Sequence, residues 1–136
     1  PRALAVTPDG NKVYAPLDAA DAQSARPAYA GLVYPAIRGG RTLLGENPAP
    51  DVVARYSTDL RIGKETPPLF LLHAFDDRTV PVSFSVTLLA AATDAGVPCE
   101  VHLLEKGGHG FGGMHLPADL PGRLWPELFA RWTAKH

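Results

Sequence analysis

Two short stretches of the chain carry residues whose types and spacing suit acid–base chemistry. Leu69–Pro81 (LFLLHAFDDRTVP) is an apolar run that ends in two adjacent carboxylates, Asp76 and Asp77. Glu105–Gly113 (EKGGHGFGG) places His109 among glycines, 32 positions after Asp77. A carboxylate that orients an imidazole, and an imidazole that takes a proton, are two of the three groups in a nucleophile–base–acid triad. The pattern predicts the acid and the base, in that order along the chain.

The third group of a triad is a nucleophile on a sharp strand-to-helix turn, and the sequence offers no such turn. A G-x-S-x-G turn exposes the serine hydroxyl and places an N–H donor beside it. None of the serines has glycine at both the −2 and the +2 position; they are Ser24, Ser57, Ser83 and Ser85. We therefore expect the nucleophile to lie outside this chain, and the chain alone to be inactive or nearly so.

Strand and helix signals alternate along the sequence. The apolar runs are bounded by prolines, as buried parallel strands often are, and the segments between them have the spacing of helices. The expected elements are, in order, a strand at 29–34, a helix at 51–56, a strand at 69–74, a helix at 83–95, a strand at 100–104 and a helix at 121–132. This alternation predicts an α/β fold, in which helices flank a parallel sheet of about three strands in three αβα layers.

The topology then positions the two candidate stretches. The carboxyl ends of parallel strands meet at one edge of the sheet, where ligands and catalytic side chains gather. Asp77 follows the second expected strand and His109 follows the third. We expect these two side chains at the same edge, within hydrogen-bonding reach of each other or one loop movement from it.

Length and composition exclude several classes of protein. The chain has 136 residues, 46% of them hydrophobic and 20% charged, which is typical of one globular domain. A net charge of −1 argues against nucleic-acid binding or a polybasic membrane patch, and no apolar run is long enough to span a bilayer. The single cysteine, Cys99, excludes an internal disulfide framework. Because the chain starts at Pro1, a removed signal peptide would not be visible, and the sequence predicts no compartment.

Other interpretations of the polar residues remain. A DD pair after a strand is often a turn or a helix cap, and a histidine in a glycine loop is often simply solvated. Metal-ligand residue types are present, but no two histidines share the spacing of a binding element, so we expect neither a metal nor a cofactor. The sulfur of Cys99 is expected to pack in the core. The ligand-type residues are His73, Asp76, Asp77, His102, His109 and His115.

Four segments together resemble a known family. PPLFLLHAFDDRTVPV and AAATDAGVPCEVHLLEKGGHGFG resemble the C-terminal part of α/β-hydrolase esterases, in particular the acetylxylan esterases and related carbohydrate-ester or lipase-like hydrolases. SARPAYAGLVYPAI and LLGENPAPDVVARYS resemble the middle section of the same group. The resemblance covers roughly residues 18–115.

The resemblance implies roles for individual residues. Asp77 would be the triad acid and His109 the general base, with Asp76 as the runner-up acid. The serine elbow and the oxyanion loop of the family precede the strand at 29–34, so residues 1–136 would form a single partial domain without the N-terminal half. The implied activity is that of a serine carboxylic-ester hydrolase, with short acyl groups on a sugar as the substrate. The alternative is a non-catalytic α/β module that binds a small molecule or a partner through the same loops.

The strand at 29–34 is expected to need a neighbour. It is apolar, carries no charged side chain, and would pair in the full fold with the strand that leads into the serine elbow. An open apolar edge is a template for another strand. We expect it to be covered by the missing N-terminal segment, by a second copy in an antiparallel two-fold dimer, or by residues 1–16 folding back.

Overall fold

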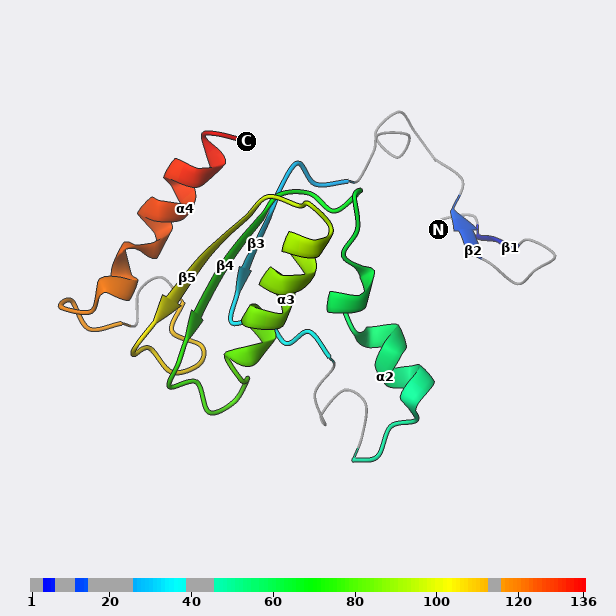
Figure 1. The fold of residues 1–136 in the computed structure, drawn as a ribbon, viewed down its shortest axis with the longest axis horizontal. Coiled ribbons are helices and arrows are strands. Elements are labelled where there is room, and N and C mark those ends of the chain that lie inside the picture. Colours follow the sequence, from blue (N-terminus) through cyan, green and yellow to red (C-terminus); the bar gives the residue numbers. More distant parts are fainter. Residues whose placement is uncertain (1–3, 7–11, 15–25, 39–45, 113–115) are drawn as a thin grey trace.

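The computed structural model of the chain describes residues 4–6, 12–14, 26–38, 46–112 and 116–136. Within these residues, three strands form one parallel sheet in the order β3–β4–β5 (Figure 1). They are β3 (Ala30–Val33), β4 (Leu69–Ala74) and β5 (Cys99–Leu104). The register pairs Leu69 with Ala30 on one side and with Cys99 on the other. The three carboxyl ends therefore lie at one edge, which confirms the predicted parallel α/β sheet.

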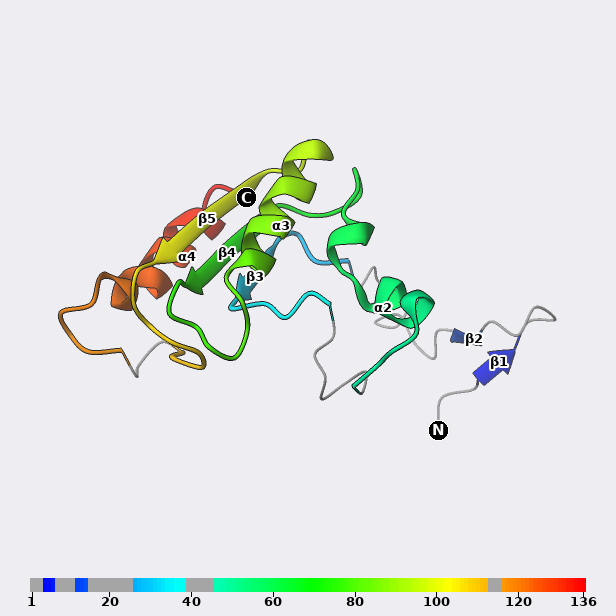
Figure 2. The same ribbon diagram turned by 60° about the horizontal axis from the view of Figure 1, so that its bottom comes forward.

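The central strand β4 is covered on both faces of the sheet. All six of its residues are buried, because helix α3 (Ser83–Asp94) lies against one face and helix α4 (Trp125–Thr133) against the other (Figures 1 and 2). Leu71 belongs to an aliphatic core cluster with Leu88 of α3. Phe70 belongs to an aromatic cluster, with its ring centroid 5.6 Å from that of Trp132. A strand buried on both faces has a continuous apolar sequence instead of an alternating one, and this gives the three αβα layers.

The helices before and after β4 have the local signals expected at their ends. Helix α2 (Pro50–Tyr56) starts with a proline, which needs no donor in the first turn, and carries Asp51 there. Between α2 and β4, a short 3₁₀ turn, η1, spans Asp59–Arg61. Helix α3 ends at Asp94, with Ala95 as its C-cap, and Gly96 follows at φ +68°, a left-handed conformation that glycine adopts without a steric penalty.

The single helix predicted over 121–132 is wrong in its first turn. A 3₁₀ turn, η2 (Pro121–Leu124), comes first, and α4 starts only at Trp125. Pro126 explains the break, because it has no N–H to donate and its ring would crowd the carbonyl of Gly122 four residues earlier. Leu124, the last residue of the 3₁₀ turn, is 57% exposed.

The described residues near the N-terminus form a second, separate sheet. β1 (Leu4–Val6) and β2 (Lys12–Tyr14) pair antiparallel with each other, and neither joins β3. Among the described residues, the expected folding back of 1–16 over the strand at 29–34 is therefore not observed. β3 lies at the edge of the three-stranded sheet. Ser24 falls outside the described residues.

No helix in the described part of the chain is both long enough and apolar enough to cross a membrane. The longest of these helices, α3, has 12 residues, whereas a bilayer requires about 20.

Candidate active site

The turn that leaves β4 positions the carboxylate of Asp77. Its Oδ1 atom accepts the backbone N–H groups of Thr79 at 2.8 Å and Val80 at 2.9 Å. An aspartate often closes a turn in this way, because its short side chain reaches the N–H groups that follow it. The side chain is fully buried. One oxygen is thus fixed by the backbone, and the other, Oδ2, is directed at the neighbouring groups.

His109 is in contact with that second oxygen. Its Nδ1 atom lies 2.7 Å from Asp77 Oδ2, and its side chain is 31% exposed. The flanking residues Gly108 and Gly110 have φ values of +63° and +73°, where a side chain would be strained. The structure gives Nε2 no hydrogen bond to any described residue, so that nitrogen is available to a further group.

Contacts on both sides of His109 hold its loop in place. Before it, the N–H groups of Gly107 and Gly108 donate to Asp76 Oδ1 at 2.9 and 2.7 Å. After it, Phe111 is buried in the aromatic cluster, and the carbonyl of Gly112 accepts the indole N–H of Trp125 at 2.9 Å. The histidine therefore lies on a short segment with two fixed ends.

The two adjacent carboxylates have different partners. The structure brings Asp77 to His109, at the carboxyl edge of the sheet where the two were expected to meet. Asp76, the runner-up acid, is not bound to the imidazole and instead accepts two backbone N–H groups of the histidine loop. If His109 acts as a base, the geometry favours Asp77 as its partner.

Tyr34, at the end of β3, was not singled out by the sequence and contacts the candidate site. Its ring centroid is 4.6 Å from that of His109 and 5.1 Å from that of Phe111. Its φ of +41° lies in the left-handed region, which is uncommon for a bulky residue. Its N–H donates to Leu72 O at 2.7 Å, so the sheet ladder holds it in this conformation.

A second histidine, His73 of β4, also contacts Asp77. The ring is completely buried, with Nε2 at 3.1 Å from Asp77 Oδ2 and 3.0 Å from Val80 O. Nδ1 lies 2.8 Å from Ser85 Oγ in α3. Sequence reasoning considered His73 only as a weak metal-ligand candidate. The available signal was a lone polar residue in an apolar strand, four positions before a carboxylate.

The structure describes three of the four serines, and none of them contacts His109. Ser57 is buried and donates to Val53 O at 2.8 Å, while Ser83 is exposed at the first residue of α3. Ser85 forms a Ser–His–Asp array with His73 and Asp77, but the array is closed to solvent. The orientation of the ring is also reversed: in a catalytic triad the serine contacts Nε2 and the carboxylate contacts Nδ1, whereas here Ser85 contacts Nδ1 and Asp77 contacts Nε2.

The electrostatics of Asp77 keep its carboxylate ionised at neutral pH. Burial by itself raises the pKa of Asp77, but the hydrogen bonds from Val80 N–H, His109 and Thr79 N–H outweigh burial and lower the pKa overall. An ionised Asp77 holds the proton of His109 on Nδ1 and leaves the lone pair of Nε2 free. By contrast, burial raises the pKa of the Cys99 thiol, which packs beside the aliphatic cluster.

His102 of β5 has ordinary strand surroundings. Its Nε2 lies 2.9 Å from Glu100 Oε1, and its ring centroid is 5.0 Å from that of Phe70. His115 falls outside the described residues. No group of three or more His, Cys, Asp and Glu side chains in the described residues is arranged to hold a metal ion.

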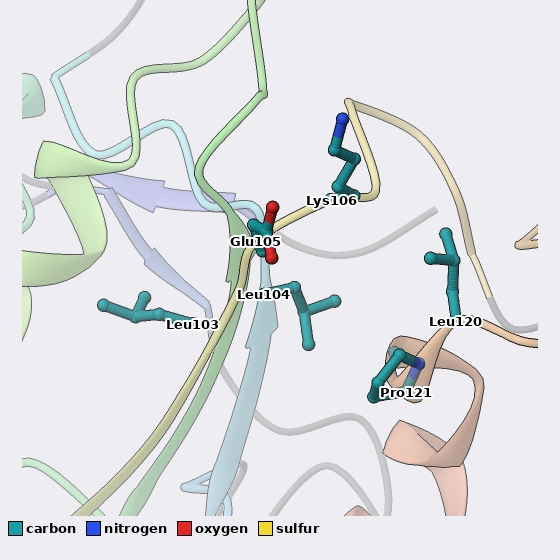
Figure 3. A pocket seen from close by; sticks show the side chains of 7 residues that line it. Leu103, Leu104, Glu105, Lys106, Leu120 and Pro121 are labelled. Atoms are coloured by element: carbon teal, nitrogen blue, oxygen red, sulfur yellow. The ribbon is translucent and has the colours of Figure 1, made fainter.

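Two hollows of the described surface lie away from Asp77 and His109. The first has a volume of about 260 Å³ and lies between β5 and η2, as Figure 3 shows. Its lining residues are Leu103, Leu104, Glu105, Lys106, Leu120, Pro121 and Gly122. A second hollow of about 240 Å³ lies beside α2 and includes the ion pair of Arg38 with Asp59, at 2.9 Å. Neither hollow is lined by Asp77 or His109, whose hydrogen-bonded pair forms the candidate site.

The architecture and the comparisons together place the chain in a class. Three parallel strands between helices, with an acid and a histidine on successive strand exits, define the C-terminal part of an α/β-hydrolase fold. The chain belongs to the prolyl oligopeptidase family, whose sequence profile matches residues 42–119. The similar solved structures are also hydrolases, which confirms the resemblance found in the sequence.

Individual relatives cover this chain well, but the chain covers only part of each of them. It is 31% identical over 110 residues to endo-1,4-beta-xylanase B of Butyrivibrio fibrisolvens, which is 75% of this chain and 16% of the xylanase. A bifunctional acetyl ester-xyloside hydrolase from Caldicellulosiruptor lactoaceticus has a TM-score of 0.77 and 31% identity, over 97% of this chain and 49% of that one. A sugar hydrolase from Lactococcus lactis has a TM-score of 0.68 and 27% identity, over 81% of this chain and 48% of that one. The chain thus spans about half the length of these solved structures.

Proposed function

We propose that this chain supplies the general base, His109, and its orienting carboxylate, Asp77, to a serine-type carboxylic-ester hydrolase. The observation that carries the proposal is the 2.7 Å contact of His109 Nδ1 with Asp77 Oδ2, which leaves Nε2 without a described partner. In a triad, Nδ1–H donates to the carboxylate and Nε2 receives the proton of the nucleophile. The half-exposed ring and the buried acid suit these two roles.

The reaction would proceed through an acyl-enzyme. A serine hydroxyl attacks the ester carbonyl while its proton passes to His109 Nε2, and collapse of the tetrahedral intermediate releases the alcohol, which takes that proton. Water then attacks the acyl-enzyme with the same base, giving the free acid and regenerating the serine. Asp77 stays ionised throughout and stabilises the imidazolium of each step. The serine and the oxyanion donors would come from a segment outside this chain.

The β3 edge is where that segment would join. β3 ends the described sheet on one side, and it leads directly to Tyr34, which contacts His109. A strand added parallel to β3 would bring its own carboxyl end to the same edge as Asp77 and His109. We therefore propose that the nucleophile-bearing segment covers β3. Pairing with a second copy of this chain is the competing arrangement, and sedimentation separates the two.

The proposed substrate is a short acyl ester of a sugar, such as an acetylated xyloside. The support is the similarity of the chain, at 27–31% identity, to an acetyl ester-xyloside hydrolase, a sugar hydrolase and a xylanase.

A chimaera tests the proposal directly. This chain would be joined to the part of the C. lactoaceticus hydrolase that it does not match, and assayed with 4-nitrophenyl acetate and with acetylated xylose. We expect turnover that His109→Ala lowers by about 10⁶ in kcat, as for loss of the base of a triad. The matched control is His102→Ala, which removes a strand histidine outside the site and should leave kcat unchanged.

Two outcomes contradict the proposal. An active chimaera that is indifferent to His109→Ala has another base, which rejects the assigned role. A folded chimaera without turnover on either ester supports the alternative of a non-catalytic binding module. The 136-residue chain alone should neither hydrolyse 4-nitrophenyl acetate nor be labelled by a fluorophosphonate. Labelling at Ser57 or Ser85 would identify a nucleophile that the structure shows as buried.

A further inference from the structure

A buried imidazole is an unexpected residue at position 73. The other five residues of β4 are apolar and buried, and an apolar side chain of similar size would pack there without desolvating a polar ring. Replacing buried polar groups by well-packed apolar ones is often neutral or stabilising. Packing and stability alone therefore do not account for His73, and its hydrogen bonds become the relevant feature.

The partners of His73 assign its protons. Nε2 faces two acceptors, Asp77 Oδ2 at 3.1 Å and Val80 O at 3.0 Å, so this nitrogen carries the hydrogen. Nδ1 faces the hydroxyl of Ser85 at 2.8 Å, which can donate to it. A neutral ring with hydrogen on Nε2 satisfies all three contacts. Asp77 and Val80 thereby fix the tautomer of His73, and the hydroxyl of Ser85 satisfies its other ring nitrogen.

His73 completes the hydrogen bonding of Asp77. A carboxylate has about four acceptor positions. In Asp77, two are taken on Oδ1 by the N–H groups of Thr79 and Val80, and two on Oδ2 by His73 and His109. His73 is the partner that reaches Oδ2 from inside the sheet. The carboxylate cannot rotate toward or away from His109 without breaking this bond.

We propose that His73 is a positioning residue, which locks the Asp77 carboxylate against His109 and thereby keeps the hydrogen of His109 on Nδ1. The chain of contacts is Ser85 to His73 to Asp77 to His109, spanning α3, β4, the turn after β4 and the loop after β5. The proposal deepens the proposed function, because a free Nε2 is what a base requires. The hydrogen bonds themselves do not depend on any activity.

The test reads the tautomers directly, on the 136-residue chain labelled with ¹⁵N-histidine. Long-range ¹H–¹⁵N spectra should show His73 with hydrogen on Nε2 and His109 with hydrogen on Nδ1, the latter proton far downfield. His73→Leu removes the donor. We expect the Nδ1 proton of His109 to exchange with water about tenfold faster, since one hydrogen bond to a charged group is worth at least that factor, and the ring to lose its preference for Nδ1–H.

Rescue by His73→Gln distinguishes positioning from packing. Its amide nitrogen can reach the place of Nε2 and donate to Asp77, so the downfield proton of His109 should return, whereas leucine fills the space without donating. A folded His73→Leu chain with unchanged His109 signals overturns the proposal. If that variant unfolds, Ser85→Ala decides, because it keeps His73 but removes the only described hydrogen-bond partner of its Nδ1 and so loosens the ring: altered His109 exchange supports the proposal, and unaltered exchange rejects it. Because no ester is turned over, the result stands apart from the chimaera assay.

Discussion

Two histidines touch the same oxygen of Asp77 and are placed in opposite surroundings. His73 is fully buried inside the central strand, with partners on both ring nitrogens. His109 lies in a glycine loop with 31% of its side chain exposed, and only Nδ1 has a described partner. The imidazole that is bonded on both sides can hold a neighbour in place. The imidazole with a free nitrogen can exchange a proton with a substrate or a nucleophile.

The difference shows why residue type alone is a weak guide to chemistry. Ser85, His73 and Asp77 have the composition of a triad and hydrogen-bonding distances to match, yet no substrate can reach them. Access and ring orientation separate this array from a catalytic one. Substitutions at Asp77, at either histidine and in the loop of His109 should therefore differ in whether they mainly lower activity or mainly lower stability.

The largest effect is expected when the shared oxygen itself is changed. Asp77→Asn places an amide where both histidines need a carboxylate, and His109 should then favour the wrong tautomer. In the chimaera, kcat should fall by about 10⁴, as in other triads that lose the charge of the acid but keep its shape. The measurement is the steady-state rate on 4-nitrophenyl acetate. A loss of less than tenfold would mean that Asp77 does not orient the base.

The next effect separates the two histidines by stability. His73→Ala leaves a cavity and frees the polar groups of Asp77 and Ser85, so the free energy of unfolding should fall by about 2–5 kcal/mol. His109→Ala removes a half-exposed ring, and the fall should be below about 1 kcal/mol. Urea denaturation of the 136-residue chain checks both values. Equal losses of unfolding free energy in the two variants would contradict the assignment of a structural role to His73 and not to His109.

A smaller effect is expected where the loop of His109 is tied to the turn after β4. Asp76→Ala removes the acceptor of the Gly107 and Gly108 N–H groups. Displacement of a catalytic group by about 1 Å costs on the order of 10²-fold in rate, so the chimaera should lose about 10- to 100-fold. Asp76→Asn keeps a carbonyl oxygen for both donors and should stay within about threefold of the parent.

Hydrogen exchange supplies the independent check on this loop. In the 136-residue chain, the amides of Gly107 and Gly108 should exchange faster in Asp76→Ala and at the parent rate in Asp76→Asn. If both variants lose activity equally while these amides stay protected, Asp76 acts through its charge and not through the loop.

The pKa of Asp77 predicts how stability depends on pH. The folded-state pKa is lowered below the unfolded value of about 3.9, so the unfolded chain binds the proton more readily. The stability that this carboxylate contributes is present above about pH 4 and is lost as the pH falls through the lower, folded-state pKa. Urea midpoints at about pH 6 and pH 3 measure the loss. Asp77→Asn should reduce the difference between the two midpoints, and an unchanged difference would assign acid sensitivity to other carboxylates.

Much of the fold followed from the sequence because its signals were local. The apolar run at 69–74 between prolines and the carboxylates, and the helical spacing over 83–95, correspond to β4 and α3 almost to the residue. The break at Pro126 was also a local signal, but the apolar stripe around it outweighed the proline in the prediction. The strand at Lys12–Tyr14 was missed because three residues carry too little pattern to detect.

The candidate site was predictable only in part. The order of Asp77 and His109 along alternating strands indicated that they would meet, because topology brings strand exits together. The contacts of His73 with Ser85, and of Asp76 with the glycine loop, depend on side-chain direction and on loop conformation, which the sequence pattern does not contain. The left-handed backbone of Tyr34 gave no signal, because tyrosine is not a residue that usually adopts it.

The smallest effect is expected at the third histidine, which supplies the baseline for the other two. His102 pairs with register partner Leu72 in the sheet, its side chain is 26% exposed, and the side chain of its partner Glu100 is 40% exposed. Partly exposed pairs of this kind contribute about 0.2–1 kcal/mol to stability. Phe70 would lose its contact with the His102 ring but would keep its contacts with the other aromatic rings of its cluster. His102→Ala should therefore lower the free energy of unfolding by less than about 1 kcal/mol in urea and leave the Nδ1 proton of His109 unmoved. A loss as large as that of His73→Ala would show that any histidine in this sheet is structurally essential. The special position of His73 beside Asp77 would then no longer be needed to explain its effect.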